Sequence, residues 1–391
     1  MKILMVAMAS QHFFRWVEQL ENAGHEVYWF DVLDSKKKVE RISWVNQIVE
    51  WKLRWNYPGR EFLKSKFRSF YNFIQQFNEY NTATIFEEKL LEIKPNLVHS
   101  FEMQLSCLPV LEVMEKYSSI QWVYSSWGSD MFFSEQIGIS DVLMSKTLKR
   151  INYLITDCFR DFKIATEKGF GNKFLGVFPG NGGFEFREER IIPPASRKTI
   201  LIKGYNNEIG KGITVVKALS SEILLLLNEY RIVVFGADLE IKDYIQNNSR
   251  FANSQITVYL RSEFIENNEL MRIMGESYIY IGNSLSDGLP NSLIEAMGMG
   301  AFPIQSNPGD ATAELINDGQ NGLLIQDALN TKHIEELLKK AILNPVMIEN
   351  AFSSNIDVIK ERYDRESNRL KIIELYSSVE KSKKIDFKHH T

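Results

Sequence analysis

The sequence has little cysteine, no long apolar run and no large excess of charge, and each scarcity excludes a class of protein. Only Cys107 and Cys158 occur among the 391 residues, with no Cys-x-x-Cys pair, so we expect no disulfide framework. No run approaches the roughly 20 apolar residues that a membrane-spanning helix requires. The net charge is −4 and the pI is near 6.0, which argues against a general affinity for nucleic acid.

Signatures of metals and dinucleotides are also missing. The six histidines are scattered, and no His/Cys/Asp spacing is typical of a metal site. The first apolar run, residues 3–9, leads into Ser10-Gln11-His12-Phe13 and not into G-x-G-x-x-G, which argues against a nicotinamide or flavin cofactor. That run has no signal-peptidase pattern after it and predicts a buried strand. We therefore expect a reduced, cytoplasmic protein without metal or cofactor.

Length and patterning predict two α/β domains. Short apolar runs alternate with longer amphipathic ones, which is the pattern of a parallel sheet covered by helices. A glycine- and proline-rich stretch around Pro193-Pro194 interrupts the alternation, which restarts at residue 199. We expect two doubly wound Rossmann-like domains that face each other across a cleft. The predicted parts are an N-terminal domain (1–186), a linker (187–198), a C-terminal domain (199–370) and a helix end with tail (371–391).

Residues 36–74 break this alternation. The segment holds ten Lys/Arg and three acids in a chain of net charge −4. Aromatic side chains are interleaved with the cations, at Trp44, Trp51, Trp55, Phe62, Phe67 and Phe70. The pattern favours a helical insertion that rests on an anionic membrane surface. The alternative is that the aromatic rings belong to the core and the cations to a solvated face.

Two acids in residues 284–306 form the main candidate site. Asp287 lies in a turn with Gly288 and Pro290, and Glu295 lies eight positions later within an apolar helical run. Pro290 suits the first turn of that helix, whose amides and dipole would bind an anion such as a diphosphate without a metal. The two carboxylates can then accept hydrogen bonds from hydroxyls on either side of the anion. The alternative is a core acid at Glu295 and a capping acid at Asp287.

This segment resembles the acid-x7-acid motif of retaining glycosyltransferases of the GT-B fold, family 4 (glycosyltransferase group 1). The form usual there has Glu at both ends followed by Ala-Met-Ala-x-Gly-x-Pro, whereas this chain has Asp287 in the first acidic place. The match continues through Gln305-Ser306 to Leu324. The resemblance implies that Glu295 binds the nucleotide ribose and that Asp287 binds hydroxyls of the donor sugar. It places the remaining donor-binding positions at Gly288, Leu289, Pro290, Asn291 and Ser292.

Two lysines complete the predicted donor site. Lys203 and Lys211 lie around the turn after the first strand of the second half. The family has Arg and Lys five apart there, on the donor phosphates, whereas here Lys replaces Arg and the spacing is longer. Fixed cations stabilise the negative charge that develops on a departing diphosphate. The alternative is a pair of solvated loop lysines.

The N-terminal half supplies the acceptor side of the predicted site. Trp127 takes the place of a histidine that many relatives carry, so we assign no catalytic histidine. Asp130 follows in the same segment, and its alternative role is to cap the next helix. His99 is expected to be structural, and Cys158 buried and inert. The candidate acceptor or cleft residues are Ser10, His12, Arg15, Asp130 and Gly182.

The resemblance implies a metal-independent, retaining hexosyltransferase without a cofactor. The expected donor is a UDP-sugar, with GDP-sugars as an alternative, and the leaving phosphate takes the acceptor proton during front-face attack. The expected acceptor is a glycan or a lipid-linked glycan of bacterial capsule, lipopolysaccharide or glycoconjugate biosynthesis, reached from the cytoplasm or the inner membrane face. Two alternatives stay open: a UDP-N-acetylglucosamine 2-epimerase of similar fold, and a non-catalytic relative that binds sugar nucleotides.

Overall fold

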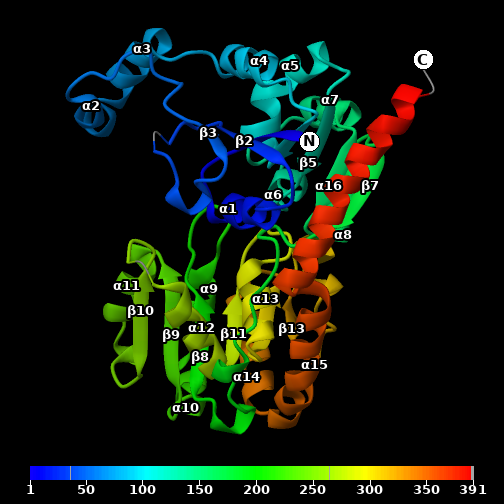
Figure 1. Ribbon diagram of the computed structural model, residues 1–391. Helices are drawn as coiled ribbons and strands as arrows, with labels where there is room; N and C mark the ends of the chain where they lie inside the picture. The colour runs from blue at the N-terminus through cyan, green and yellow to red at the C-terminus, as the bar shows by residue number, and fades with distance from the viewer. Residues whose placement is uncertain (36, 264, 389–391) are drawn as a thin grey trace. The chain divides into compact units, whose positions relative to one another are not determined.

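The computed structural model describes residues 1–35, 37–263 and 265–388, with side chains up to residue 381 (Figure 1). The chain divides into two compact units. Unit 1 contains residues 1–157, 161–182 and the chain from Arg369 on, and unit 2 contains residues 158–160 and 183–368. Each unit is built on one parallel sheet, which confirms the expected α/β class.

Unit 1 has a seven-stranded sheet in the order β3-β2-β1-β4-β5-β6-β7. Every strand pair is parallel. The central strands are buried along nearly their whole length, as expected for a parallel sheet that is covered on both faces. The strands are β1 (Lys2–Ala7), β2 (Glu26–Asp31), β3 (Asn46–Ile48), β4 (Leu97–Phe101), β5 (Gln121–Ser125), β6 (Tyr153–Thr156) and β7 (Lys173–Val177).

Two apolar clusters of unit 1 lie on opposite faces of this sheet. Successive residues of β1 alternate between them, since Ile3 and Met5 join one cluster and Leu4 and Val6 the other. The helices in this part of the chain are α1 (Gln11–Val17), α2 (Arg60–Lys66), α3 (Arg68–Asn78), α4 (Thr82–Ile93), α5 (Leu111–Lys116), α6 (Ser129–Phe132), α7 (Asp141–Arg150) and α8 (Phe159–Glu167). The serine or asparagine before α1, α4 and α7 accepts a hydrogen bond from a first-turn amide, which fixes where these helices begin.

Unit 2 has a six-stranded sheet in the order β10-β9-β8-β11-β12-β13, again with parallel pairs. Its strands are β8 (Thr199–Lys203), β9 (Arg231–Ala237), β10 (Ile256–Leu260), β11 (Ser277–Gly282), β12 (Phe302–Ser306) and β13 (Leu323–Ile325). Its helices are α9 (Gly212–Lys217), α10 (Ser221–Leu226), α11 (Leu239–Gln246), α12 (Asn267–Glu276), α13 (Asn291–Gly298), α14 (Thr331–Ile342) and α15 (Pro345–Tyr363).

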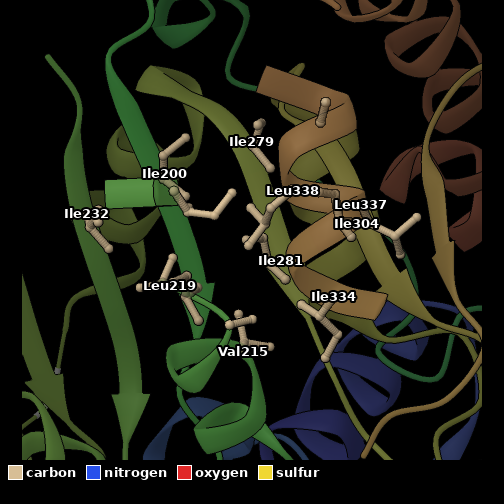
Figure 2. Close-up of a cluster of buried hydrophobic side chains, with 14 of the residues drawn as sticks. Ile200, Val215, Leu219, Ile232, Ile279, Ile281, Ile304, Ile334, Leu337 and Leu338 are labelled. Carbon is tan, nitrogen blue, oxygen red and sulfur yellow. The ribbon is translucent and has the colours of Figure 1, made fainter. Parts of the chain in front are cut away.

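Helices cover both faces of the second sheet. On one face, isoleucines of four strands meet apolar side chains from α9, the residues after it and α14, as Figure 2 shows. On the other face, α12 and α13 pack through a separate cluster that includes Met274, Leu293 and Met297. The helix that carries Glu295 is therefore held against the sheet by its own apolar side.

Residues 187–198, which the sequence predicts as a linker, lie within unit 2. Arg197 is buried there, and its guanidinium donates hydrogen bonds to the carbonyls of Ile192, Ser277 and Met299. This part of the chain is thus fastened to the second domain, although Pro193-Pro194 breaks its periodicity.

The segment predicted as a basic-aromatic helical insertion, residues 36–74, is α-helical only in its second part, and its first part has one 3-10 turn, Glu40–Ile42. Lys36 lies outside the described residues. Asn46–Ile48 form the edge strand β3, and Trp51 is buried, stacks on Phe30 and donates to the carbonyl of Asp31 at 2.9 Å. The core alternative therefore holds for Trp51, whereas α2 and α3 carry the exposed rings.

The C-terminal helix α16 (Arg365–Lys388) follows α15 after one residue. From Arg369 on it belongs to unit 1, where Ile372 and Tyr376 are fully buried. The predicted tail, residues 371–391, is thus helical as far as Lys388, and residues 389–391 lie outside the described part. None of the helices in the described ranges is long and apolar enough to cross a membrane.

Candidate functional site

The predicted donor residues of unit 2 gather at the carboxyl ends of β8 and β11. The turn after β8 pairs with the turn after β11, because Lys211 N donates to Asn283 O and Leu285 N donates to Ile209 O, each at 2.9 Å. A bridge between Gly210 and Ser284 lies between these bonds. The loop that leads to Asp287 is therefore fixed against the loop that carries Lys211.

Of the two predicted lysines, the structure brings Lys203 to the acid site. Lys203 Nζ lies 3.9 Å from Asp287 Oδ2, with both side chains partly exposed. This ion pair is loose and adds little stability, so both groups can turn to a ligand at small cost. Lys211 Nζ instead donates to the carbonyl of Asn207 in its own turn, at 2.8 Å.

Arg160 holds the loop of Asp287 through hydrogen bonds to backbone carbonyls. No motif in the sequence predicts this role. Its side chain is only 7% exposed, and Nη1 donates to the carbonyls of Asp287 at 2.9 Å and Pro308 at 2.8 Å. The carboxylate of Glu314 accepts from the backbone amides of Phe159 and Arg160, which holds the start of α8 within unit 2. Two loops that follow neighbouring strands are thus tied to one guanidinium.

Helix α13 begins at Asn291, one position later than predicted, with Pro290 as its N-cap residue. The carbonyl of Pro290 accepts from the amides of Leu293 and Ile294, and no side chain caps the helix. The amides of Asn291 and Ser292 belong to the first turn of α13, where a helix backbone has no carbonyl of its own to accept from them. This amino end lies four residues or fewer from Asp287 and Gly288 in the chain, where the sequence predicts an anion-binding site.

Glu295 is half-buried and lies on the same side of α13 as Ser292, because Ser292 precedes it by three positions. Beneath this side, Tyr280 Oη on β11 is 2.8 Å from Ser292 Oγ. Burial, together with the negative charges of Asp287 and Glu295, raises the pKa of the Tyr280 phenol well above its ordinary value. Tyr280 is therefore a protonated donor at the floor of the site, which sequence reasoning missed because it is an ordinary strand residue.

A buried polar layer continues this floor at the ends of β11 and β12. Ser284 N donates to Ser306 Oγ at 2.9 Å, and Asn283 Nδ2 donates to Ala328 O at 2.8 Å. Gln305 is 2% exposed, and its Oε1 has no hydrogen-bond partner among the described atoms. A buried carbonyl without a donor is uncommon, so Gln305 is a candidate contact for an N–H or O–H group of a ligand.

The predicted acceptor residues of unit 1 group around the start of α1. Ser10 caps the helix, since its Oγ accepts from Phe13 N at 3.2 Å. The exposed ring of His12 lies 5.6 Å from the ring of Trp127. Arg15 is half-buried, and Gly182, at φ +73°, packs so closely on Gln19 that a Cβ there would clash with it. The structure brings His12 and Trp127 together and uses Gly182 for a close approach of the backbone.

Asp130 is placed differently, in the interior of unit 1. It is 2% exposed and accepts hydrogen bonds from Met103 N, Tyr124 Oη and Trp127 N. These bonds hold the loop after β5. They are not the helix cap of the alternative interpretation, because Asp130 lies within α6, whose N-cap residue is Gly128 and which has no side-chain cap bond. Burial and the neighbouring charge of Asp130 raise the pKa of Glu102 to about 8.

Glu102 also has an uncommon backbone conformation, φ 70° and ψ 139°. Its carboxylate accepts from the amides of Gln104 and Leu105, each at 2.7 Å, and so caps the π-helical turn Met103–Cys107. Strained non-glycine residues and π-helical turns are both frequent at functional sites of proteins. Glu102 combines the two at the end of β4. No motif in the sequence predicts that Glu102 and Asp130 form a pair.

His99 is structural, as predicted. Its ring is fully buried, with Nδ1 2.6 Å from Tyr376 Oη and Nε2 2.8 Å from Ser125 Oγ. Burial lowers the pKa of His99 to about 3, so the ring is neutral in the folded protein. Cys158 is buried as expected, and so is Cys107.

Comparisons with known proteins agree with this geometry. Residues 186–357 match the family model of glycosyl transferases group 1. Sucrose-phosphate synthase from Thermosynechococcus elongatus is similar in structure, with a TM-score of 0.71, 14% identity, and coverage of 97% of this chain and 99% of that one. Curated protein sequences give no match.

Two further solved structures are similar. HepE of Anabaena, in complex with UDP and glucose, has a TM-score of 0.65 and 13% identity over 97% of this chain and all of that one. The pneumococcal O-GlcNAc transferase GtfA, in complex with UDP and GlcNAc, has a TM-score of 0.58 and 17% identity over 77% of this chain and 60% of that one. The two parallel sheets and these likenesses establish the GT-B fold.

Proposed function

Because residues 186–357 match the family model of glycosyl transferases group 1, we propose that this chain transfers a sugar from a nucleoside diphosphate sugar to an acceptor hydroxyl. The proposal is carried by one observation: the Lys203–Asp287 pair lies next to the amino end of α13, with Glu295 farther along that helix. Cation, amides and two carboxylates are what a diphosphate between two sugars requires.

The donor would bind with its diphosphate at the amides of Asn291 and Ser292 and at the ammonium of Lys203. Gly288 offers a backbone amide close by, and Leu289 and Pro290 set the path of the turn. Lys211 would reach the phosphates by exchanging its bond to a backbone carbonyl for one to the donor. Asp287 would accept from hydroxyls of the transferred sugar and Glu295 from the ribose.

The reaction would proceed with retention of configuration and without a metal. The bond between the anomeric carbon and the phosphate oxygen breaks while the acceptor oxygen bonds to the same face of that carbon. The leaving phosphate oxygen takes the acceptor proton. Lys203 and the dipole of α13 stabilise the charge that grows on the diphosphate, which is the main help the protein gives to such a step.

We favour UDP as the nucleotide, and GDP is the alternative. UDP is present in the complexes of HepE and GtfA, which are similar to this chain in fold. On the acceptor side, Ser10, His12 and Arg15 are our candidate contacts. We propose a glycan or lipid-linked glycan acceptor of bacterial surface polysaccharide biosynthesis, met in the cytoplasm or at the inner face of the membrane.

The test is release of nucleoside diphosphate from UDP-sugars and GDP-sugars by the full chain, with and without EDTA. We expect activity that survives EDTA, and loss of at least about a hundredfold in Asp287→Ala and Glu295→Ala with unchanged circular dichroism. Glu336→Ala, which removes an exposed acid of α14, is the control. An active Glu295→Ala enzyme, or conversion of UDP-N-acetylglucosamine without nucleotide release, would refute the proposal.

A further inference from the structure

The geometry of α2 and α3 points to a second functional surface: an aromatic face that inserts into an anionic lipid membrane. We define this face by five side chains that are 56–62% exposed, namely Phe62, Phe67, Phe70, Phe73 and Phe77. The inference stands apart from the proposed transfer reaction, because binding to lipid requires neither donor nor acceptor. It concerns α2 and α3, residues 60–78, which overlap the second part of the basic-aromatic segment 36–74.

Helix α3 has its polar and apolar sides reversed relative to a helix packed on a core. Its buried residues are Gln75 and Asn78, whereas Phe70, Phe73 and Phe77 follow the i, i+3, i+7 spacing of a single stripe and face solvent. Exposed single apolar residues are ordinary, but a continuous aromatic stripe of this kind marks an interaction surface.

The reversed polarity of α3 has a structural cause where the chain enters α2 and leaves α3. Arg54 N donates to Asn78 O and Tyr80 N donates to Lys52 O, each at 2.8 Å. The buried amide of Asn78 bonds to both the backbone N–H and the carbonyl of Trp55. Polar hydrogen bonds thus join the segment before α2 to the segment after α3. The phenylalanines are not needed to fix the two helices to unit 1.

The phenylalanine rings instead lie close to one another. Phe62 and Phe67 have ring centroids 6.0 Å apart, and Phe73 and Phe77 have theirs 5.6 Å apart. Figure 1 shows α2 and α3 away from the strands of the first sheet, in the blue part of the chain. The rings therefore form two close pairs on helices whose aromatic side chains are exposed.

The charges beside these rings favour lipid over a protein partner. Residues 60–78 contain four cations and one acid, Glu61, in a chain of net charge −4. Lys64 and Arg68 line an open hollow with a volume of about 440 Å³, together with Glu61, Ser65, Tyr71 and Asn72. Rings that enter the acyl boundary, next to cations that bind headgroup phosphates, are the two contributions that hold an interfacial helix on an anionic bilayer.

The experiment is sedimentation of the full chain with vesicles of phosphatidylcholine alone or mixed with phosphatidylglycerol, at low and high salt. We expect binding to the anionic vesicles that weakens with salt. Replacing Phe70, Phe73 and Phe77 with Ser should weaken binding roughly tenfold or more. Replacing Lys64, Lys66 and Arg68 with Gln should weaken binding about fivefold for each cation removed.

The matched control is the double variant Leu225→Ser/Leu239→Ser, which removes two exposed apolar side chains of unit 2 and should bind as the unmodified chain does. All substituted positions are exposed, and circular dichroism checks that each variant is folded. Failure of the unmodified chain to sediment with either vesicle would overturn the inference. So would a concentration-dependent dimer that the phenylalanine variant abolishes while lipid binding is unchanged, because the face would then join two copies.

Discussion

Tyr280 and Ser292 join the floor of the donor site to the first turn of α13 through hydroxyl oxygens that lie 2.8 Å apart. Tyr280 is fully buried on β11, and Ser292 belongs to the turn whose amides face the expected diphosphate. Because burial and nearby carboxylates keep the phenol protonated, it can donate a hydrogen bond at neutral pH. The bond orients the turn before a ligand arrives, which lowers the entropy cost of binding.

The first prediction removes this bond. We expect Tyr280→Phe to weaken donor binding about fivefold, since one neutral hydrogen bond contributes about 1 kcal/mol, while the chain stays folded. Tyr244→Phe is the matched control, because Tyr244, on α11, also makes one hydrogen bond through its hydroxyl, which accepts from Arg250 Nη2. Calorimetric titration with UDP measures the affinity of both variants. Equal affinity in the two variants would show that the hydroxyl has no part in donor binding.

The second prediction concerns Arg160, which joins the loops of Asp287 and Pro308. Arg160→Lys keeps the charge but replaces the planar guanidinium, whose Nη1 donates to both carbonyls, with a compact ammonium on a more flexible side chain, so we expect kcat/KM to fall at least about tenfold. Arg197→Lys is the control, because Arg197 is also buried and also donates to carbonyls, away from the acids. Both variants should lose stability, by about 1–3 kcal/mol. If the Arg160 and Arg197 variants lose similar stability and show a similar loss of kcat/KM, Arg160 is not a positioning residue.

The elements that the sequence predicted well are those whose signal is local. Alternating apolar runs located the buried strands, and the turn around Pro290 located the start of α13 within one residue. Arg160 and Tyr280 were missed because their roles depend on contacts with residues more than ten positions away in the chain. The edge strand β3 was hidden within a charged segment, since an edge strand needs only one covered face.

The same limit applies to the aromatic residues of 36–74. Composition alone could not separate Trp51, which stacks in the core, from Phe70, which faces solvent. The distinction is set by β3 and by the polar closure at Asn78, both of which are tertiary features.

The third prediction tests the close packing of the floor. A Cβ added at Gly282 would lie 2.2 Å from Gln305 Oε1 and 2.7 Å from Tyr280 Oη, so one of these groups would have to move. We expect Gly282→Ala to weaken UDP binding at least about tenfold and to lower the melting temperature by a few degrees. Gly171→Ala is the control, because a Cβ at Gly171 meets nothing within 4 Å. Unchanged UDP affinity in Gly282→Ala would place the ligand elsewhere.

The last prediction concerns the Glu102–Asp130 pair and the pH dependence of stability. The folded pKa of Glu102, about 8, lies above the ordinary value of 4.5, so between these values the folded chain keeps a proton that the unfolded chain has lost. Stability linked to this group is therefore fully present below pH 4.5 and is lost as pH rises through the folded pKa. Glu102→Gln cannot ionise, so its melting temperature should fall less steeply over this range. Glu112→Gln, at an exposed position of α5, should follow the unmodified chain, and parallel curves for all three proteins would mean that Glu102 titrates normally.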